Sequence, residues 1–150
     1  MFLGCKIMEH KHSGTDNNLY SEIILDYYKN PINFGEIKKP DLRASGGNIS
    51  CGDTVALYIK FDKEKITEIS FTGQGCAISR AGSCVLTEIV QGKKVGEILK
   101  MNPNTVLDEL GGTIQTRMKC ALLGLNVIKK ALSEWKKNPT PTLTVANINI

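Results

Sequence analysis

The chain has 150 residues, a formal net charge of +4, 41% apolar residues and 23% charged residues. This composition is typical of one globular domain rather than a disordered chain. No apolar run approaches a length of about 18 residues, which a membrane-spanning helix needs. The basic residues are scattered and aromatic residues are few, so no nucleic-acid-binding surface is predicted. Residues 1–18 show neither apolar periodicity nor a secretory signal, which predicts a flexible arm on a cytoplasmic protein with reduced thiols.

Helical periodicity comes first along the chain and strand periodicity follows. Residues 19–27 repeat apolar side chains at helical spacing, and Asn30-Pro31 ends this helix. Residues 54–61 alternate apolar and polar side chains, and a tight turn leads into a second strand at 66–72, which predicts an antiparallel hairpin. A third strand at 42–48 is expected beside it.

The second half of the chain has a helical pattern. Four helices are expected, at residues 79–90 with Ser79 as the cap, 95–101, 105–110 and about 116–135. The last of these carries an apolar stripe that suits packing on a sheet. Residues 136–150 are interpreted as a C-terminal tail, with docking as an edge strand as the alternative. The prediction is an α+β domain over residues 19–135, with a small antiparallel sheet of about three strands packed against several helices.

Three of the five cysteines lie beside glycines or at the start of a predicted helix. They occur in the segments Ser50–Asp53, Gly73–Ser79 and Arg117–Cys120. Exposed backbone amides and the helix dipole favour a thiolate at such positions, and a thiolate is the form that binds metal or attacks sulfur. The other two are Cys5, interpreted as incidental, and Cys84, interpreted as a buried core residue.

Together with Asp53, the three cysteines Cys51, Cys76 and Cys120 make a candidate set of four metal ligands. Zinc accepts sulfur and oxygen donors, whereas iron–sulfur clusters are normally held by thiolates. A carboxylate is a harder donor than a thiolate, so Asp53 would be a weak ligand that suits a cluster that must leave. The residues alone leave three functions open: a cluster scaffold, a zinc-dependent sulfurtransferase and a structural zinc module.

From about Leu19 to Leu132 the chain resembles the NifU N-terminal and IscU-type iron–sulfur cluster assembly scaffolds. The resemblance lies in the segments Tyr27–Gly35, Cys51–Asp53, Gly73–Ser79 and Lys119–Ala121. It implies a scaffold rather than an enzyme, which takes sulfur from a cysteine desulfurase, assembles a [2Fe–2S] cluster with iron, and transfers it to apo acceptor proteins. The implied cluster ligands are Cys51, Cys76 and Cys120, with Asp53 as the labile fourth ligand.

Two departures from the family pattern precede the third cysteine. Lys119 stands where many members have histidine, and residues 104–116 lack the Leu-Pro-Pro-Val-Lys segment, so the dedicated chaperone that reads it is not expected. The pattern Arg117-x-Lys119-Cys120 resembles the SufU-like branch, whose members bind zinc and accept persulfide sulfur, although the insertion of that branch is absent. A zinc-dependent sulfurtransferase is therefore the alternative function. Zinc in the isolated protein would not decide between the two, because vacant thiolate sites scavenge it.

The basic residues near the third cysteine are predicted to support the site electrostatically. Lys119 and Arg117 would offset the negative charge of the thiolates and of Asp53. Cys120 is the first candidate for the persulfide acceptor, because it opens a helix. The sequence leaves open the electron donor, the acceptor proteins and whether two chains share a cluster as a homodimer.

Overall fold

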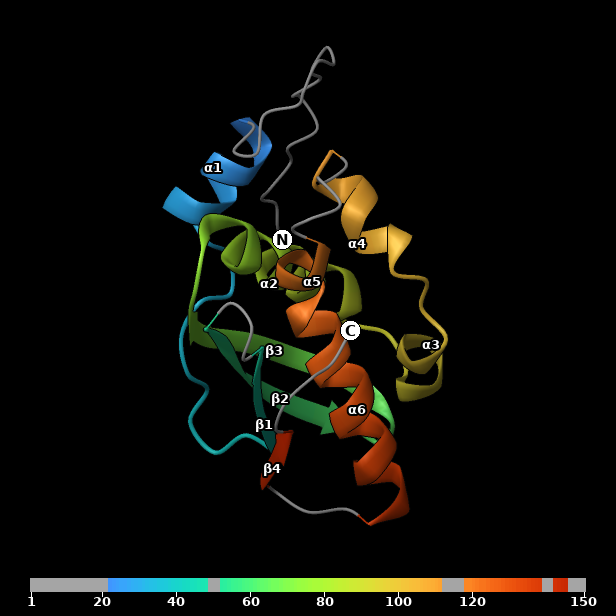
Figure 1. Ribbon diagram of the computed structural model, residues 1–150. Helices are drawn as coiled ribbons and strands as arrows, with labels where there is room; N and C mark the ends of the chain where they lie inside the picture. The colour runs from blue at the N-terminus through green and yellow to red at the C-terminus, as the bar shows by residue number, and fades with distance from the viewer. Residues whose placement is uncertain (1–21, 49–51, 112–117, 139–141, 146–150) are drawn as a thin grey trace.

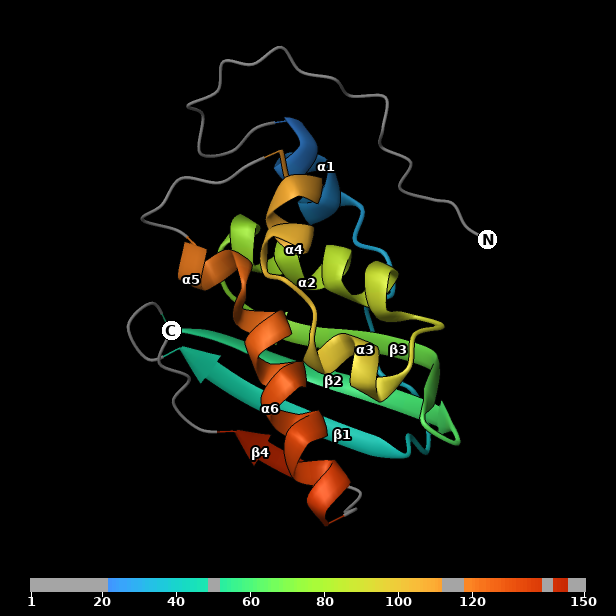
Figure 2. The same ribbon diagram turned by 90° about the vertical axis from the view of Figure 1, so that its right-hand side faces the viewer.

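The computed structural model of the protein describes residues 22–48, 52–111, 118–138 and 142–145. The elements in this part of the chain are α1 (Glu22–Lys29), β1 (Leu42–Asn48), β2 (Asp53–Asp62), β3 (Lys65–Gln74), α2 (Ala77–Val90), α3 (Val95–Leu99), α4 (Asn104–Glu109), α5 (Met118–Ala121), α6 (Leu123–Lys137) and β4 (Thr142–Val145). Helices cover one face of the sheet, and others gather beyond one end of it (Figure 1 and Figure 2). None of the described helices is long and apolar enough to span a membrane.

Among the described residues the sheet has the strand order β3-β2-β1-β4. β1, β2 and β3 pair antiparallel in chain order, which confirms the predicted small antiparallel sheet packed against helices. The β2–β3 hairpin forms where two alternating segments flank a tight turn, in which Lys63 has a φ of 65°.

The strand β4 adds a parallel pairing to this sheet, because Arg43–Gly46 of β1 pair with Thr142–Val145. The structure therefore differs from the predicted tail over residues 136–150 in two ways: α6 extends to Lys137, and the edge-strand alternative holds for four residues. So short a strand alternates too weakly for the sequence to favour it over a tail. Its pairing depends on α6, which crosses the sheet and returns the chain to β1.

The apolar core lies between the sheet and the two helices α2 and α6. α2 packs against β3, and α6 packs against β1 and β2. One face of β2 supplies Val55, Leu57 and Ile59, which are at most 3% exposed. The ring of Phe61 stacks on Trp135 with 4.4 Å between the ring centroids, so the apolar stripe of α6 faces the sheet as predicted.

Two of the differences between the predicted and the observed helices bear on the site. α2 begins at Ala77 with Cys76 as its N-cap, whereas the predicted cap Ser79 lies inside the helix and is buried. The single helix predicted from about Thr116 to Trp135 is interrupted between α5 and α6, because Leu122 has φ −99° and ψ 5° and turns the chain. This turn lets α5 pack on α2 while α6 crosses the sheet.

Candidate metal centre

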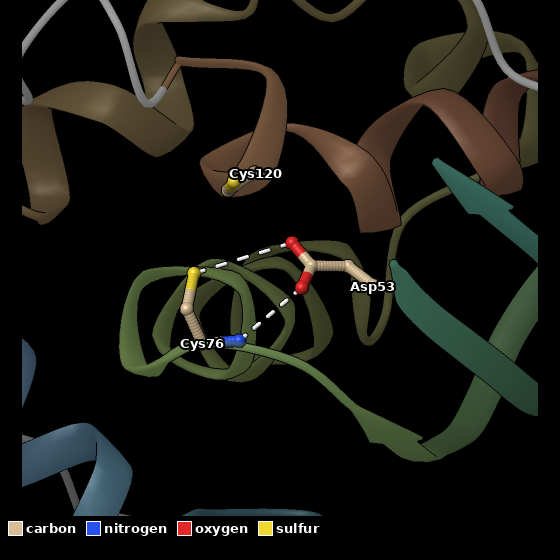
Figure 3. Close-up of side chains that lie close together, drawn as sticks. All are labelled: Asp53, Cys76 and Cys120. Atoms are coloured by element: carbon tan, nitrogen blue, oxygen red, sulfur yellow. Dashed lines mark hydrogen bonds between the residues drawn. The ribbon is translucent and has the colours of Figure 1, made fainter. Parts of the chain in front are cut away.

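Two thiols and a carboxylate from three separate segments meet near the end of the sheet. Asp53 is the first residue of β2, Cys76 directly precedes α2, and Cys120 lies on α5 (Figure 3). One carboxylate oxygen and the two sulfur atoms all lie within 4.8 Å of one another. The structure thus brings together three of the four ligands expected from the sequence. The fourth, Cys51, lies outside the described residues.

The start of α2 holds the Asp53 carboxylate. The backbone N–H of Cys76 donates a hydrogen bond of 3.2 Å to Asp53 Oδ1, and the thiol points toward Oδ2 at 4.0 Å (Figure 3). The first amides of a helix lack intrahelical partners and carry the positive end of the helix dipole. This end of α2 therefore suits an anionic set of ligands.

Gly75 permits the unusual burial of this carboxylate. Asp53 is only 3% exposed, although ionisable side chains are rarely buried without partners. Gly75 has a φ of 158°, and a Cβ at this position would lie 2.5 Å from Asp53 Oδ1 and 2.8 Å from Cγ. A side chain at residue 75 would therefore push the carboxylate away from the Cys76 amide. The sequence motif contained this glycine, but its contact with Asp53 could not be predicted from the motif.

We expect Gly75→Ala to weaken the binding of Co²⁺, a spectroscopic probe of sulfur–oxygen sites, by about 10-fold. The reason is that the added methyl group displaces the Asp53 carboxylate. Anaerobic titration followed by the absorption of bound Co²⁺ measures the effect. Gly96→Ala on α3 is the matched control, because a Cβ there meets nothing within 4 Å. Unchanged affinity in Gly75→Ala would contradict a role for this close approach.

The third ligand candidate is less accessible than the second. Cys120 is the third residue of α5 and is 3% exposed, whereas Cys76 is half-buried. Another molecule can therefore reach the Cys120 sulfur only when the site opens. Lys119 is exposed on the same short helix, and Arg117 lies outside the described residues, so their electrostatic role stays a prediction.

Cys84 is not part of this group of ligands. It is fully buried on α2, which confirms its interpretation as a core residue. Its sulfur accepts a hydrogen bond of 2.8 Å from the backbone N–H of Ile32 and lies 3.3 Å from the Ile32 carbonyl oxygen, to which the thiol donates. Burial raises the pKa of Cys84 from 9.0 to about 12. The stability that this protonated thiol contributes is complete below pH 9 and is lost as the pH rises toward 12.

We expect Cys84 to resist alkylation in the native protein at pH 8. The difference between pKa values of 9.0 and about 12 lowers the thiolate fraction by about 1000-fold, and burial excludes the reagent as well. Treatment with iodoacetamide followed by peptide mass spectrometry measures the reaction at each cysteine, with half-buried Cys76 as the internal reference. Denatured protein is the control, in which both should react. Modification of native Cys84 as fast as Cys76 would contradict this expectation.

A comparison with known families assigns the chain to one of them. The sequence profile described as the NifU-like N-terminal domain matches residues 19–141. The chain belongs to this family. Membership confirms the resemblance predicted from the sequence segments around Tyr27–Gly35, Asp53, Cys76 and Cys120.

Relatives of this chain in the NifU-like family are named for iron–sulfur cluster assembly. The scaffold protein IscU 1 of Archaeoglobus fulgidus is 35% identical over 121 residues, which cover 80% of this chain and 79% of that protein. The iron–sulfur cluster assembly enzyme IscU of Drosophila melanogaster is 34% identical over 122 residues, which cover 79% of each chain.

Solved structures of similar proteins share the fold. A proposed cluster assembly scaffold for the SUF system from Fervidobacterium islandicum matches with a TM-score of 0.65 and 32% identity, over 76% of this chain and 96% of that chain. The N-terminal part of a NifU-like protein from Brucella abortus matches with a TM-score of 0.66 over 80% of this chain and 96% of that chain. At 21% identity the second match supports the fold alone.

Proposed function

We propose that the protein is a scaffold on which a [2Fe–2S] cluster is assembled and from which the cluster passes to apo acceptor proteins. The observation that carries this proposal is the convergence of Asp53, Cys76 and Cys120 within 4.8 Å. The names of the relatives from Archaeoglobus and Drosophila support the same role. In this proposal the cluster is cargo rather than a permanent cofactor.

The donor atoms of the site suit a cargo that binds and later leaves. Thiolates from Cys76 and Cys120, with Cys51 as the proposed third, bind the soft iron–sulfur core firmly. The Asp53 carboxylate is a harder donor and is proposed as the ligand that an acceptor displaces first. Its hydrogen bond with the Cys76 amide gives the carboxylate a defined partner within the protein when it is not a ligand.

Sulfur is proposed to arrive as a persulfide on a cysteine desulfurase. The Cys120 thiolate attacks the outer sulfur of that persulfide, a new S–S bond forms on Cys120, and the donor cysteine leaves as a thiolate. Each transferred sulfur is then reduced to sulfide by two electrons, one from a ferrous ion, which becomes ferric, and one from a separate reductant, and Cys120 returns to its thiolate. Two sulfides and two ferric ions complete the cluster. Because Cys120 is buried, this route requires the site to open when the donor docks.

Anaerobic reconstitution tests the proposal. The reduced protein is incubated with ferrous iron, cysteine, a cysteine desulfurase and a reductant. We expect charge-transfer absorption in the visible spectrum, acid-labile sulfide equal to the bound iron, and loss of both when the cluster passes to an apo ferredoxin. A protein that stays colourless under these conditions would contradict the scaffold role.

A zinc-dependent sulfurtransferase is the second candidate function. The pattern Arg117-x-Lys119-Cys120, which resembles the SufU-like branch, favours it. In this case the same ligands would hold zinc until one thiol is released to accept sulfur. The reconstitution experiment separates the two functions, since a colourless zinc protein that takes up persulfide sulfur without building a cluster would support the sulfurtransferase.

A further inference from the structure

The helices α2 and α5 approach so closely at one point that their backbones touch. Gly82 lies in the interior of α2, and a Cβ built on it would collide with the carbonyl oxygen of Ala121. The same Cβ would lie 2.9 Å from the Ala121 carbonyl carbon and 3.1 Å from its Cα. All three atoms are backbone atoms, so no side chain can rotate away to make room.

This contact lies next to a proposed ligand. Ala121 directly follows Cys120 on α5, and Cys76 directly precedes the helix that contains Gly82. The separation of α2 and α5 therefore determines how far the Cys120 sulfur lies from the Cys76 sulfur and from Asp53. Metal–ligand distances tolerate deviations of only about 0.2 Å, so a small outward shift of α5 would remove Cys120 from a shared metal site.

We propose that Gly82 is a positioning residue, which sets the distance of Cys120 from the other ligands by allowing the backbones of α2 and α5 to touch. The inference rests on the proposed function, because it assumes that Cys120 is a ligand. Glycine is one of the poorest helix-forming residues, and an alanine at a buried interior position would favour the helix. Glycine is required at this position because the backbone of Ala121 occupies the space that an alanine methyl group would need.

A second glycine at the same helix packing provides a matched control. A Cβ at Gly124 on α6 would lie 3.1 Å from two atoms of α2, Leu86 Cδ2 and Ser83 Oγ. Both belong to side chains, which can shift by a few tenths of an ångström. Gly124→Ala therefore adds the same methyl group to the same buried region without pressing against the backbone next to Cys120.

Anaerobic Co²⁺ titrations of wild type, Gly82→Ala, Gly124→Ala, Cys120→Ser and the double variant Gly82→Ala/Cys120→Ser test the proposal. We expect Gly82→Ala to lower the Co²⁺ affinity at least about 10-fold and to reduce the thiolate-to-cobalt charge-transfer absorption, whereas Gly124→Ala stays within about twofold of wild type. In the Cys120→Ser background, Gly82→Ala should change the affinity little, because the ligand on which it acts is already absent.

Other results would overturn the assignment. If Gly82→Ala lowered the Co²⁺ affinity equally with and without Cys120, Gly82 would act on the fold as a whole. A Gly82→Ala chain that does not fold even with Co²⁺ would show the same. Wild-type affinity in Gly82→Ala would show that the backbone contact does not position the ligand. If wild type and Cys120→Ser bound Co²⁺ with equal affinity, Cys120 would not be a ligand. That result would contradict the proposed site itself, and it is obtained without any Gly82 variant.

Discussion

Serine in place of Cys76 or Cys120 is expected to lower the affinity for Co²⁺ by about 100-fold or more and to abolish cluster formation. A serine hydroxyl is similar in shape to a thiol, but it stays protonated near neutral pH and is a hard donor. Each variant therefore removes one proposed soft ligand from a group whose donor atoms lie within 4.8 Å of one another. Anaerobic Co²⁺ titration measures the affinity, and iron and acid-labile sulfide after reconstitution measure the cluster.

Cys84→Ala is the matched control for these cysteine variants. It removes a buried thiol from α2, the helix that follows Cys76, but Cys84 is hydrogen-bonded to the backbone of Ile32 and is not in the group of Asp53, Cys76 and Cys120. We expect it to bind Co²⁺ as wild type does, with a lower stability because a core contact and two hydrogen bonds are lost. If Cys84→Ala lost as much Co²⁺ affinity as Cys120→Ser, the assignment of ligands would be wrong.

Asp53→Ala is expected to lengthen the lifetime of the bound cluster and to slow its transfer, each by about 10-fold. The carboxylate is the hardest donor of the proposed ligand set, so we expect an acceptor thiolate to replace it most easily. It also adds a negative charge to a site that already contains thiolates, and removing that charge lowers the repulsion within the loaded site. Decay of the visible absorption measures the lifetime, and circular dichroism with an apo ferredoxin measures the transfer.

Asp53→Asn separates the charge of this residue from its structural contact. The asparagine oxygen can still accept the hydrogen bond from the Cys76 amide, while the negative charge is gone. We expect Asp53→Asn to be more stable than Asp53→Ala and to slow transfer to a similar extent. Transfer from both variants at the wild-type rate or faster would contradict the role of Asp53 as the release-promoting ligand.

The sequence predicted that Asp53, Cys76 and Cys120 lie together, but not the contacts that hold them. Thiols beside glycines and helix starts identified Cys76 and Cys120, because those positions have local signals. The hydrogen bond from the Cys76 amide to Asp53 has none, since it joins residues 23 positions apart. Serine is a favoured N-cap residue, so the sequence predicts Ser79 as the cap of α2. The structure has Cys76 at this position, and the Cys76 amide donates its hydrogen bond to the Asp53 carboxylate of β2.

The division between α5 and α6 shows the same limit. The apolar stripe runs without interruption across Leu122, so local periodicity predicts one helix. The turn at Leu122 lets one segment contact α2 while the next crosses the sheet. The packing of Ala121 on Gly82 has no counterpart in helical periodicity, because an interior glycine gives no sign of which backbone will approach it.

The parallel pairing of β4 with β1 affects how dimer formation should be studied. With β4 removed, Arg43–Gly46 would present unpaired amide and carbonyl groups along an open border of the sheet. Such borders readily join those of other molecules. A truncated chain that ends before Thr142 would therefore associate for reasons unrelated to a shared cluster. Experiments that ask whether two molecules hold one cluster between them need protein in which this last strand is intact.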